Sequence, residues 1–180
     1  MWRQTEIAEQ EADIILAVID SRSGLNELDK DMADGLRRLK KPVFLIANKC
    51  EGKAQEQYLG EFYQLGLGDP IPVSAEHGLG IDKLYALLKP LCPADTDIAE
   101  EKDRPLKLAI VGRPNVGKST LINRLLKTDR LLTGPEAGVT RDAITVPWEW
   151  KGNKVLLTDT AGLRKYGKVD DDLEKIAAAD

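Results

Sequence analysis

Short apolar runs alternate with amphipathic helices along this chain, and this alternation constrains its fold more than any other feature. The runs at 13–20, 43–48, 71–73 and 106–111 are apolar at nearly every position. Continuous apolarity is typical of strands that are covered on both faces. Strands separated by helices predict right-handed crossover connections and a mostly parallel sheet. We therefore expect an α/β fold in which helices flank the sheet.

The helices between these runs are predicted by their caps and apolar stripes. Asn26 precedes Asp29 by three residues, as in a reciprocal capping box, so a helix should begin there. Its buried stripe is predicted to consist of Leu28, Met32, Leu36 and Leu39. A second helix should carry on one side Tyr58, Leu59, Phe62 and Tyr63. A third helix should bury Ile81, Leu84, Tyr85 and Leu88.

Two further strands are expected close together near the end of the chain. The segments 143–151 and 154–159 are joined at Gly152 and Asn153, which predicts a hairpin. Pro147 lacks an amide donor, so its strand is expected at a sheet edge. One face of this strand should pack against the protein rather than stack on a ligand, through Ile144, Val146, Trp148 and Trp150.

Composition and charge exclude several classes of protein. An apolar content of 42% over 180 residues excludes a mainly disordered chain. The longest apolar run, 14–19, is too short to cross a membrane, and the first residues do not form a secretory signal. Cys50 and Cys92 lie far apart, which indicates free thiols in a reducing cytosol rather than disulfides or a zinc site. A net charge of −4 argues against direct DNA binding, so we expect a cytoplasmic protein without a membrane segment.

Residues 112–119 read G-R-P-N-V-G-K-S and match the phosphate-loop pattern G-x-x-x-x-G-K-[ST] between a predicted strand and a helix at 118–127. Glycines let backbone amides turn inward toward phosphate oxygens, and the helix N-terminus adds its dipole. Lys118 supplies a charge to the β and γ phosphates, and the Ser119 hydroxyl can bind Mg²⁺. The expected fold class is therefore that of the P-loop NTPases. The predicted phosphate-binding residues are Gly112, Arg113, Pro114, Asn115, Val116, Gly117, Lys118, Ser119 and Thr120.

A second motif follows the last predicted strand. Asp159 can hold Mg²⁺ through water, and the Gly162 amide can contact a γ phosphate. The predicted switch segment consists of Asp159, Thr160, Ala161, Gly162 and Leu163. Thr140 lies in a long irregular stretch and is either a ligand that closes over Mg²⁺ with the γ phosphate or an ordinary loop residue. The candidate catalytic residues are Lys118, Thr140 and Gly162.

Two further segments could read a base. Asn48, Lys49 and Glu51 follow an apolar strand, and the Glu51 carboxylate can accept from the N1–H and amino groups of guanine, a donor pair that adenine lacks. Ser74 and Ala75 follow the next strand and could offer a backbone amide to the guanine oxygen. Taken alone, N-K-x-E also fits a polar strand end. His77 is interpreted as a surface residue.

These motifs resemble those of a known family. GRPNVGKST, GVTRD and DTAG are similar to the first three motifs of translation-factor-class bacterial GTPases, and NKCEG and SAEHGLG to the last two. Over practically the whole chain the resemblance is to the tandem-G-domain GTPases of the Der (EngA) family. It implies binding of GTP, GDP and Mg²⁺, GTP hydrolysis, and a role in late assembly of the large ribosomal subunit.

Three positions refine this resemblance. In relatives with asparagine at the Asn115 position, K⁺ can replace an arginine finger, which implies a K⁺ site here. Leu163 stands where many GTPases place a glutamine that orients water, so intrinsic hydrolysis should be slow. Glu51 stands where relatives usually have aspartate, and its side chain is one methylene longer.

The motifs stand in an unusual order, because the base-reading pair precedes the phosphate loop. The resemblance explains this order if residues 1–92 are the C-terminal half of a first G domain and residues 105–180 the N-terminal half of a second. Residues 93–104 are polar and mostly acidic between two prolines, and are expected to be a linker. The chain is then expected to be a fragment of a longer protein.

Together, the two halves supply one complete set of G-domain elements. We expect them to close into one circularly permuted G domain, because either half alone would leave sheet edges and helix faces uncovered. Separate halves, or halves exchanged between two copies, are the alternatives. The alternative functions to a GTPase are a non-hydrolysing nucleotide-binding interaction module, an inactive fragment and, more remotely, an ATPase.

Overall fold

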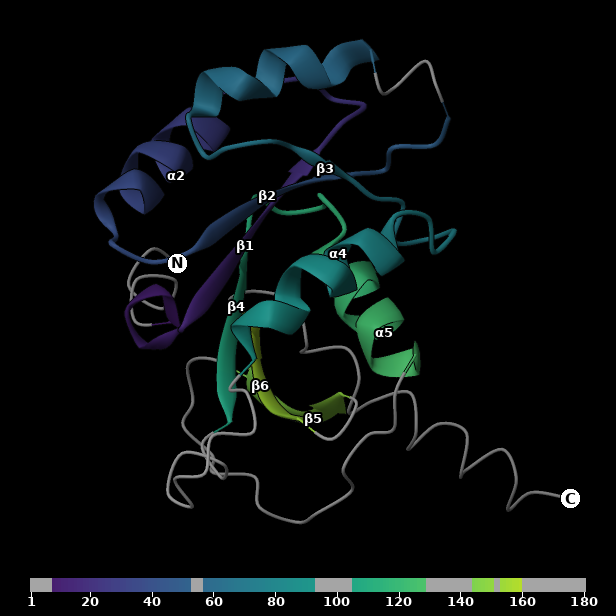
Figure 1. Ribbon diagram of the computed structural model, residues 1–180. Helices are drawn as coiled ribbons and strands as arrows, with labels where there is room; N and C mark the ends of the chain where they lie inside the picture. The colour runs from purple at the N-terminus through teal and green to yellow at the C-terminus, as the bar shows by residue number, and fades with distance from the viewer. Residues whose placement is uncertain (1–7, 53–56, 93–104, 129–143, 151–152, 160–180) are drawn as a thin grey trace, which may run out of the picture.

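The computed structural model describes residues 8–52, 57–92, 105–128, 144–150 and 153–159, and within these ranges one sheet organises the chain (Figure 1). Its strand order is β3-β2-β1-β4-β6-β5. The strands are β1 (Ile14–Asp20), β2 (Val43–Asn48), β3 (Ile71–Pro72), β4 (Leu106–Val111), β5 (Ile144–Trp150) and β6 (Asn153–Asp159). All neighbours pair in parallel except β5 and β6, so the predicted mostly parallel sheet is confirmed.

The centre of the sheet joins strands that are far apart in the sequence. Strand β1 pairs on one side with β2, where Ile15 faces Val43, and on the other side with β4, where Ile14 faces Leu108. The Lys107 amide also donates to Asp13 Oδ2 at 2.9 Å. Since parallel strands end at the same edge of the sheet, the residues that follow β1, β2 and β4 lie close together.

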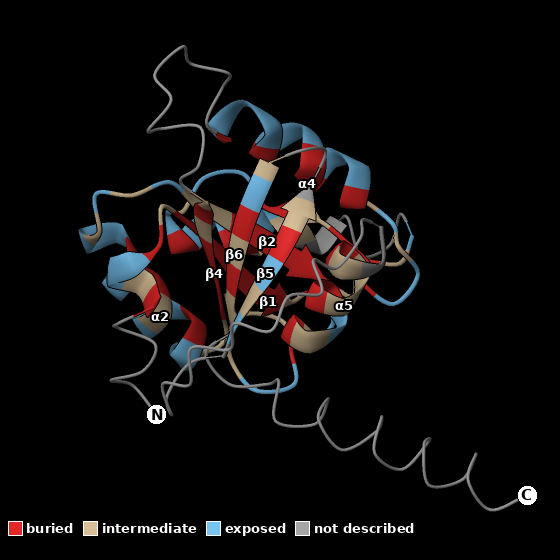
Figure 2. Cartoon of the chain, turned by 90° about the horizontal axis from the view of Figure 1, so that it is seen from below, coloured by how far each residue is buried: buried red, intermediate tan, exposed pale blue. Residues whose placement is uncertain are grey.

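Helices cover both faces of this sheet (Figures 1 and 2). Besides residues 8–11, the helical elements in the described part of the chain are α2 (Glu27–Arg38), η1 (Gln57–Leu65), α4 (Ile81–Leu88), η2 (Lys89–Leu91) and α5 (Lys118–Thr128). Helix α2 and the 3₁₀ segment η1 pack on one face, whereas α4 and α5 pack on the other. None of the helices in the described part of the chain is long and apolar enough to cross a bilayer.

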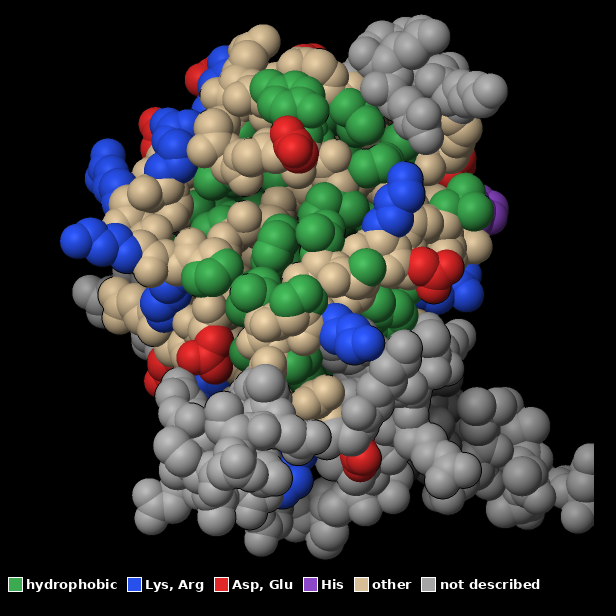
Figure 3. Space-filling view, in the orientation of Figure 1, with side chains coloured by type: hydrophobic (Ala, Val, Ile, Leu, Met, Phe, Trp, Pro, Cys, Tyr) green, Lys and Arg blue, Asp and Glu red, His purple; other side chains and the backbone are tan. Residues whose placement is uncertain are grey.

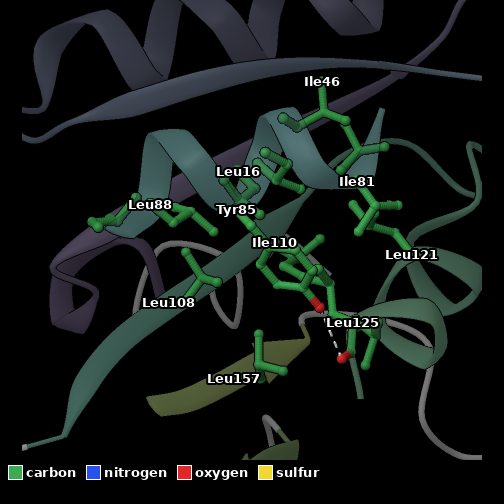
Figure 4. Packing of buried hydrophobic residues seen from close by; sticks show 14 of the residues in the cluster. Leu16, Ile46, Ile81, Tyr85, Leu88, Leu108, Ile110, Leu121, Leu125 and Leu157 are labelled. Atoms are coloured by element: carbon green, nitrogen blue, oxygen red, sulfur yellow. Dashed lines mark hydrogen bonds between the residues drawn. The ribbon is translucent and has the colours of Figure 1, made fainter. Parts of the chain in front are cut away.

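The alternating side chains of β1 enter two separate apolar clusters. Leu16 points toward α4 and α5, in a cluster that also holds Leu108 and Leu125 (Figure 4). Trp148 belongs to the same cluster. The Tyr85 ring lies 6.2 Å from the Trp148 ring, and its hydroxyl donates to the Leu125 carbonyl at 3.2 Å. The residues next to Leu16 along β1 enter the cluster beneath α2 and η1, with Ala33, Leu36, Phe62 and Leu65.

Several expected features agree with the structure. The capping box between Asn26 and Asp29 is present, and α4 buries its whole predicted stripe. Strand β5 is one of the two edge strands of the described sheet, which accommodates Pro147. Trp148 packs in the core, as expected. The predicted hairpin is confirmed, because β5 and β6 pair antiparallel. Of the two predicted turn residues, Asn153 begins β6, whereas Gly152 and the predicted linker 93–104 lie outside the described residues.

Two predicted stripes are wrong in part. In α2, Leu28 is 50% exposed, and the buried positions are Asp29, Ala33 and Leu36, because Asp29 is held inside by an ion pair described below. The second predicted helix, which was expected to carry Tyr58, Leu59, Phe62 and Tyr63 on one side, is the 3₁₀ segment η1. With three residues per turn, Phe62 and Leu65 share its buried face, and Tyr63 is rotated into solvent at 56% exposure.

Candidate nucleotide-binding site

The phosphate-loop sequence forms a curled turn between β4 and α5. Gly117 has φ +96°, and Asn115 takes the left-handed conformation at φ +65°, which asparagine tolerates better than most residues. A Cβ at Gly112 would overlap the Val18 carbonyl, and one at Gly117 would overlap the Asn48 side chain. Glycine is therefore required at both positions by the neighbouring strands. The turn fits the shape expected of a backbone cradle for phosphate.

Lys118 begins α5 and folds over this turn. Its Nζ donates to the carbonyl oxygens of Gly112 and Arg113, both at 2.8 Å, and the residue is only 6% exposed. The charge is thus held at the mouth of the turn, next to the helix N-terminus. This arrangement concentrates positive potential where the sequence predicts a β or γ phosphate.

Asn48, at the end of β2, is buried between two loops. Its Nδ2 donates to the Val116 carbonyl in the phosphate loop at 2.8 Å, and its Oδ1 accepts from the Ala75 amide at 3.0 Å. Both ends of the amide are therefore used. This one side chain joins the phosphate loop to both segments that were predicted to read a base.

Lys49 makes a second connection to the phosphate loop. Its backbone is left-handed, at φ +64°, and its Nζ donates to the Asn115 carbonyl at 2.9 Å and to Asp20 Oδ2 at 2.6 Å. Burial alone would raise the pKa of the Asp20 carboxyl. The hydrogen bonds from Lys49 and from the Arg22 amide, together with the Lys49 charge, outweigh burial and leave that pKa below its ordinary value.

The Glu51 carboxylate lies beside the Ser74–Ala75 loop. It accepts from Ser74 Oγ at 3.2 Å and forms an ion pair with Arg22. His77 Nε2 lies 3.7 Å from the same carboxylate and is half exposed, as expected of a surface residue. The longer glutamate side chain is thus oriented by three neighbours at the edge of the predicted base site.

The Arg113 side chain turns away from the phosphate loop toward α2. Its Nε donates to Asp29 Oδ1 at 2.7 Å, and its terminal nitrogen donates to Ser23 Oγ at 3.1 Å. Asp29 is fully buried and also accepts from the Asn26 amide through its capping box. Arg113 therefore contributes its backbone to the phosphate loop, while its charge neutralises a buried carboxylate.

Metal ligands were predicted at four positions. Ser119 lies in the first turn of α5, and Asn115 lies at the tip of the loop, so a hydroxyl and an amide are available beside the cradle. Asp159 ends β6 beside Ile110 of β4, at the same edge of the sheet, whereas Thr140 lies outside the described residues. The predicted Mg²⁺ ligands Ser119, Thr140 and Asp159 offer the oxygen atoms that Mg²⁺ prefers, whereas Asn115 was predicted to hold K⁺. Separately, ligand atoms of Glu51, Glu76 and His77 lie within 4.8 Å of one another.

Thr160, Ala161, Gly162 and Leu163 lie outside the described residues. Of the remaining predicted residues, the structure brings to one edge of the sheet Asn48, Lys49, Glu51, Ser74, Ala75 and the phosphate loop. Sequence reasoning missed the ion pair between Asp29 and Arg113, because a capping aspartate is normally exposed. It also missed Arg124, which contacts the loop after Ser74. The only feature of the sequence that pointed to Arg124 was its position on the helix that follows the phosphate loop.

The sheet order, the loop between β4 and α5 and the N-K-x-E segment after β2 define a P-loop NTPase fold with circularly permuted motifs. A family model described as a 50S ribosome-binding GTPase matches residues 107–180. Across its whole length the chain is similar to proteins named GTPase Der, which confirms the predicted resemblance.

Three of these relatives illustrate the similarity. The chain is 50% identical over 191 residues to the protein of Rhodopseudomonas palustris, covering 100% of the chain and 42% of the relative. It is 46% identical over 206 residues to that of Rhizobium johnstonii and 46% over 208 residues to that of Agrobacterium fabrum, covering 100% of the chain and 44% of each relative. The chain thus spans less than half the length of the curated relatives it matches.

Proposed function

We propose that this chain binds GTP and GDP and hydrolyses GTP in the manner of a Der-type GTPase. The hydrogen bond from Asn48 to Val116 carries the proposal, because it joins an N-K-x-E segment directly to a phosphate loop. The N-K-x-E segment suits a base, and the phosphate loop beside it suits phosphates. The similarity to GTPase Der along the whole chain supports the same function.

In this proposal the triphosphate lies against the loop amides of residues 112–120, and Lys118 provides the compensating charge. Ser119, Asp159 and Thr140 would hold Mg²⁺, which neutralises charge that develops on the phosphates. Gly162 would contact the γ phosphate through its amide. The chain's contribution to catalysis is then to position the phosphates and to stabilise charge around an attacking water.

Guanine would be bound by Asn48, Lys49 and Glu51 together with Ser74 and Ala75. Glu51 accepts from the N1–H and amino groups, which adenine cannot provide as a pair. The Ser74 and Ala75 amides already donate to Leu79 and Asn48, so a later amide of the same loop would donate to the guanine oxygen. Because a site built to hydrogen-bond a polar group strongly rejects ligands that lack it, this set gives selectivity for guanine over adenine.

Calorimetric titration with GDP tests nucleotide binding. The unchanged chain should bind one equivalent, whereas Lys118→Ala should lose most of the affinity, because the charge at the mouth of the loop is gone. Lys83→Ala removes an exposed lysine of α4 and serves as the control. No GDP binding by the unchanged chain would indicate the inactive alternative, and displacement of GDP by excess ATP would indicate an ATPase.

Turnover with Mg²⁺ tests hydrolysis. We expect slow release of phosphate from GTP, since Leu163 cannot orient water. We also propose that Asn115 helps to hold K⁺, so replacing K⁺ with Na⁺ should lower the rate. Equal rates in the two salts would contradict the K⁺ site, and tight GTP binding without any turnover would identify a non-hydrolysing binding module.

We also propose that residues 1–92 and 105–180 act together as one permuted G domain, with 93–104 as the linker. The pairing of β1 with β4 supports this arrangement. A monomer by light scattering is the expected result, and a dimer would indicate halves exchanged between copies. The proposed partner is the large ribosomal subunit in the cytoplasm, and GTP-dependent sedimentation with that subunit is the corresponding test.

A further inference from the structure

Arg124 extends from α5, the helix that follows the phosphate loop, to the loop after β3. Its Nε donates to the Ala75 carbonyl at 3.0 Å, and its terminal nitrogen donates to the Glu76 carbonyl. The two acceptors are consecutive backbone oxygens. A guanidinium group binds them with two nitrogens of one rigid plane, which fixes both position and direction.

The loop that receives these bonds is closed at its base. The Ser74 amide donates to the Leu79 carbonyl at 2.9 Å, and the Leu79 amide returns a bond to Ser74 at 3.1 Å. Gly78 lies over the guanidinium, where an added Cβ would be 3.1 Å from Arg124 Cζ. Arg124 therefore lies against the inside of a short closed loop and supports it from the α5 side.

A hydrogen bond to a backbone carbonyl also orients the amide of the next residue. A trans peptide plane is rigid, so the N–H of each residue points away from the preceding C=O. By binding the Ala75 and Glu76 carbonyls, Arg124 directs two consecutive peptide planes, while Asn48 fixes the Ala75 amide from the other side. The loop amides are thus set before any base arrives.

We propose that Arg124 is a positioning residue for base recognition, acting through the Ala75–Glu76 backbone on the contact with the guanine oxygen. This inference rests on the proposed guanine site. It assigns a role in base selectivity to the helix that begins at the phosphate loop. Arg124 itself would touch no nucleotide atom.

The experiment compares three nucleotides on purified variants by calorimetry. GDP carries the guanine oxygen, 6-thio-GDP replaces it with a sulfur that accepts hydrogen bonds weakly, and IDP lacks only the amino group read by Glu51. Arg124→Met keeps the aliphatic stem and removes the donors. We expect it to raise the Kd for GDP about tenfold, because two charge-assisted bonds that order the loop are lost.

The preference of the variants for GDP over the two analogues distinguishes a positioning role of Arg124 from a purely structural role. In Arg124→Met the preference for GDP over 6-thio-GDP should narrow, whereas the preference for GDP over IDP should stay the same. Arg124→Lys retains the charge without the planar fork and should give intermediate values. Tyr85→Phe removes the hydrogen bond to Leu125 of α5, so it should lower the melting temperature and leave both preferences unchanged.

Equal weakening of all three nucleotides in Arg124→Met would overturn the inference and make Arg124 a structural residue only. Unchanged binding of all three would also overturn it. Both results would leave the proposed guanine site standing, since the unchanged chain binds GDP. If the unchanged chain binds no GDP, the proposed function fails, and the inference fails with it.

Discussion

Asn48 Nδ2 donates a 2.8 Å hydrogen bond to the carbonyl oxygen of Val116, 68 residues further along the chain. The bond crosses between β2 and the phosphate loop, and it is buried. It therefore couples two segments that sequence analysis could assign only to separate halves. Its removal should affect both the stability of the fold and the affinity for nucleotide.

Replacing Asn48 with alanine tests this coupling. The Val116 carbonyl and the Ala75 amide lose their buried partner, so the free energy of unfolding should fall by about 2 kcal/mol, as is usual for unsatisfied buried groups. GDP affinity should fall as well. Urea unfolding and calorimetry measure the two effects, and Gln64→Ala, on the exposed surface of η1, is the control. A stable variant that binds GDP normally would contradict this prediction.

Gly117→Ala should damage the phosphate loop. At φ +96° an alanine is strained, and its Cβ would overlap the Asn48 side chain. We expect a lower melting temperature and loss of GDP binding. Gly35→Ala is the matched control, because the same methyl group there meets nothing within 4 Å and lies inside α2. That control should stabilise the protein by about 0.5–1 kcal/mol.

Arg113→Met should be costly, because it leaves the Asp29 carboxylate buried without its ion-pair partner. Breaking such a pair from one side typically lowers the free energy of unfolding by about 3 kcal/mol or more. Combining it with Asp29→Asn removes the buried charge, so the double variant should regain part of the loss. Chemical unfolding of the single and double variants measures this. Lys30→Met, in an exposed pair with Glu27, should change little, and equal losses for Lys30→Met and Arg113→Met would contradict the assignment.

Asp20 should make stability depend on pH. Its pKa in the folded protein lies below the unfolded value of about 3.9, so the charged form is favoured by folding. The stabilisation is complete above the unfolded pKa and is lost as the pH falls through the folded pKa. The difference in unfolding free energy between the unchanged chain and Asp20→Asn should therefore be constant near pH 7 and shrink below about pH 4. If the difference in unfolding free energy is the same near pH 7 and below about pH 4, the Lys49 contact is not the source of the stabilisation.

Much of the fold could be predicted because the relevant signals are local. Strand β4 occupies the residues expected from its apolar run, and α4 buries all four residues of its predicted stripe. The capping box at Asn26 was also visible in the sequence, since it involves residues only three apart. These features depend on short-range periodicity and capping, which a single sequence records well.

The remaining features depend on contacts between distant segments. By its spacing Leu28 belongs to an apolar stripe, yet it is exposed and Asp29 is buried. Asp29 is buried because Arg113, in the phosphate loop, forms an ion pair with it. The contact between Arg124 and the Ala75 carbonyl likewise joins residues 49 positions apart. No helical or strand period encodes such pairings, so sequence patterns could predict the candidate residues of the site but not how they are tethered to one another.

The place of β1 between β2 and β4 has a consequence for how the chain is made. Translation delivers β1 and β2 well before β4, which begins at Leu106. Until β4 is made, the edge of β1 that pairs with it in the folded sheet lacks this partner. The centre of the sheet is therefore completed only after residues 106–111 have been made, so its strands cannot all pair in the order in which they are synthesised.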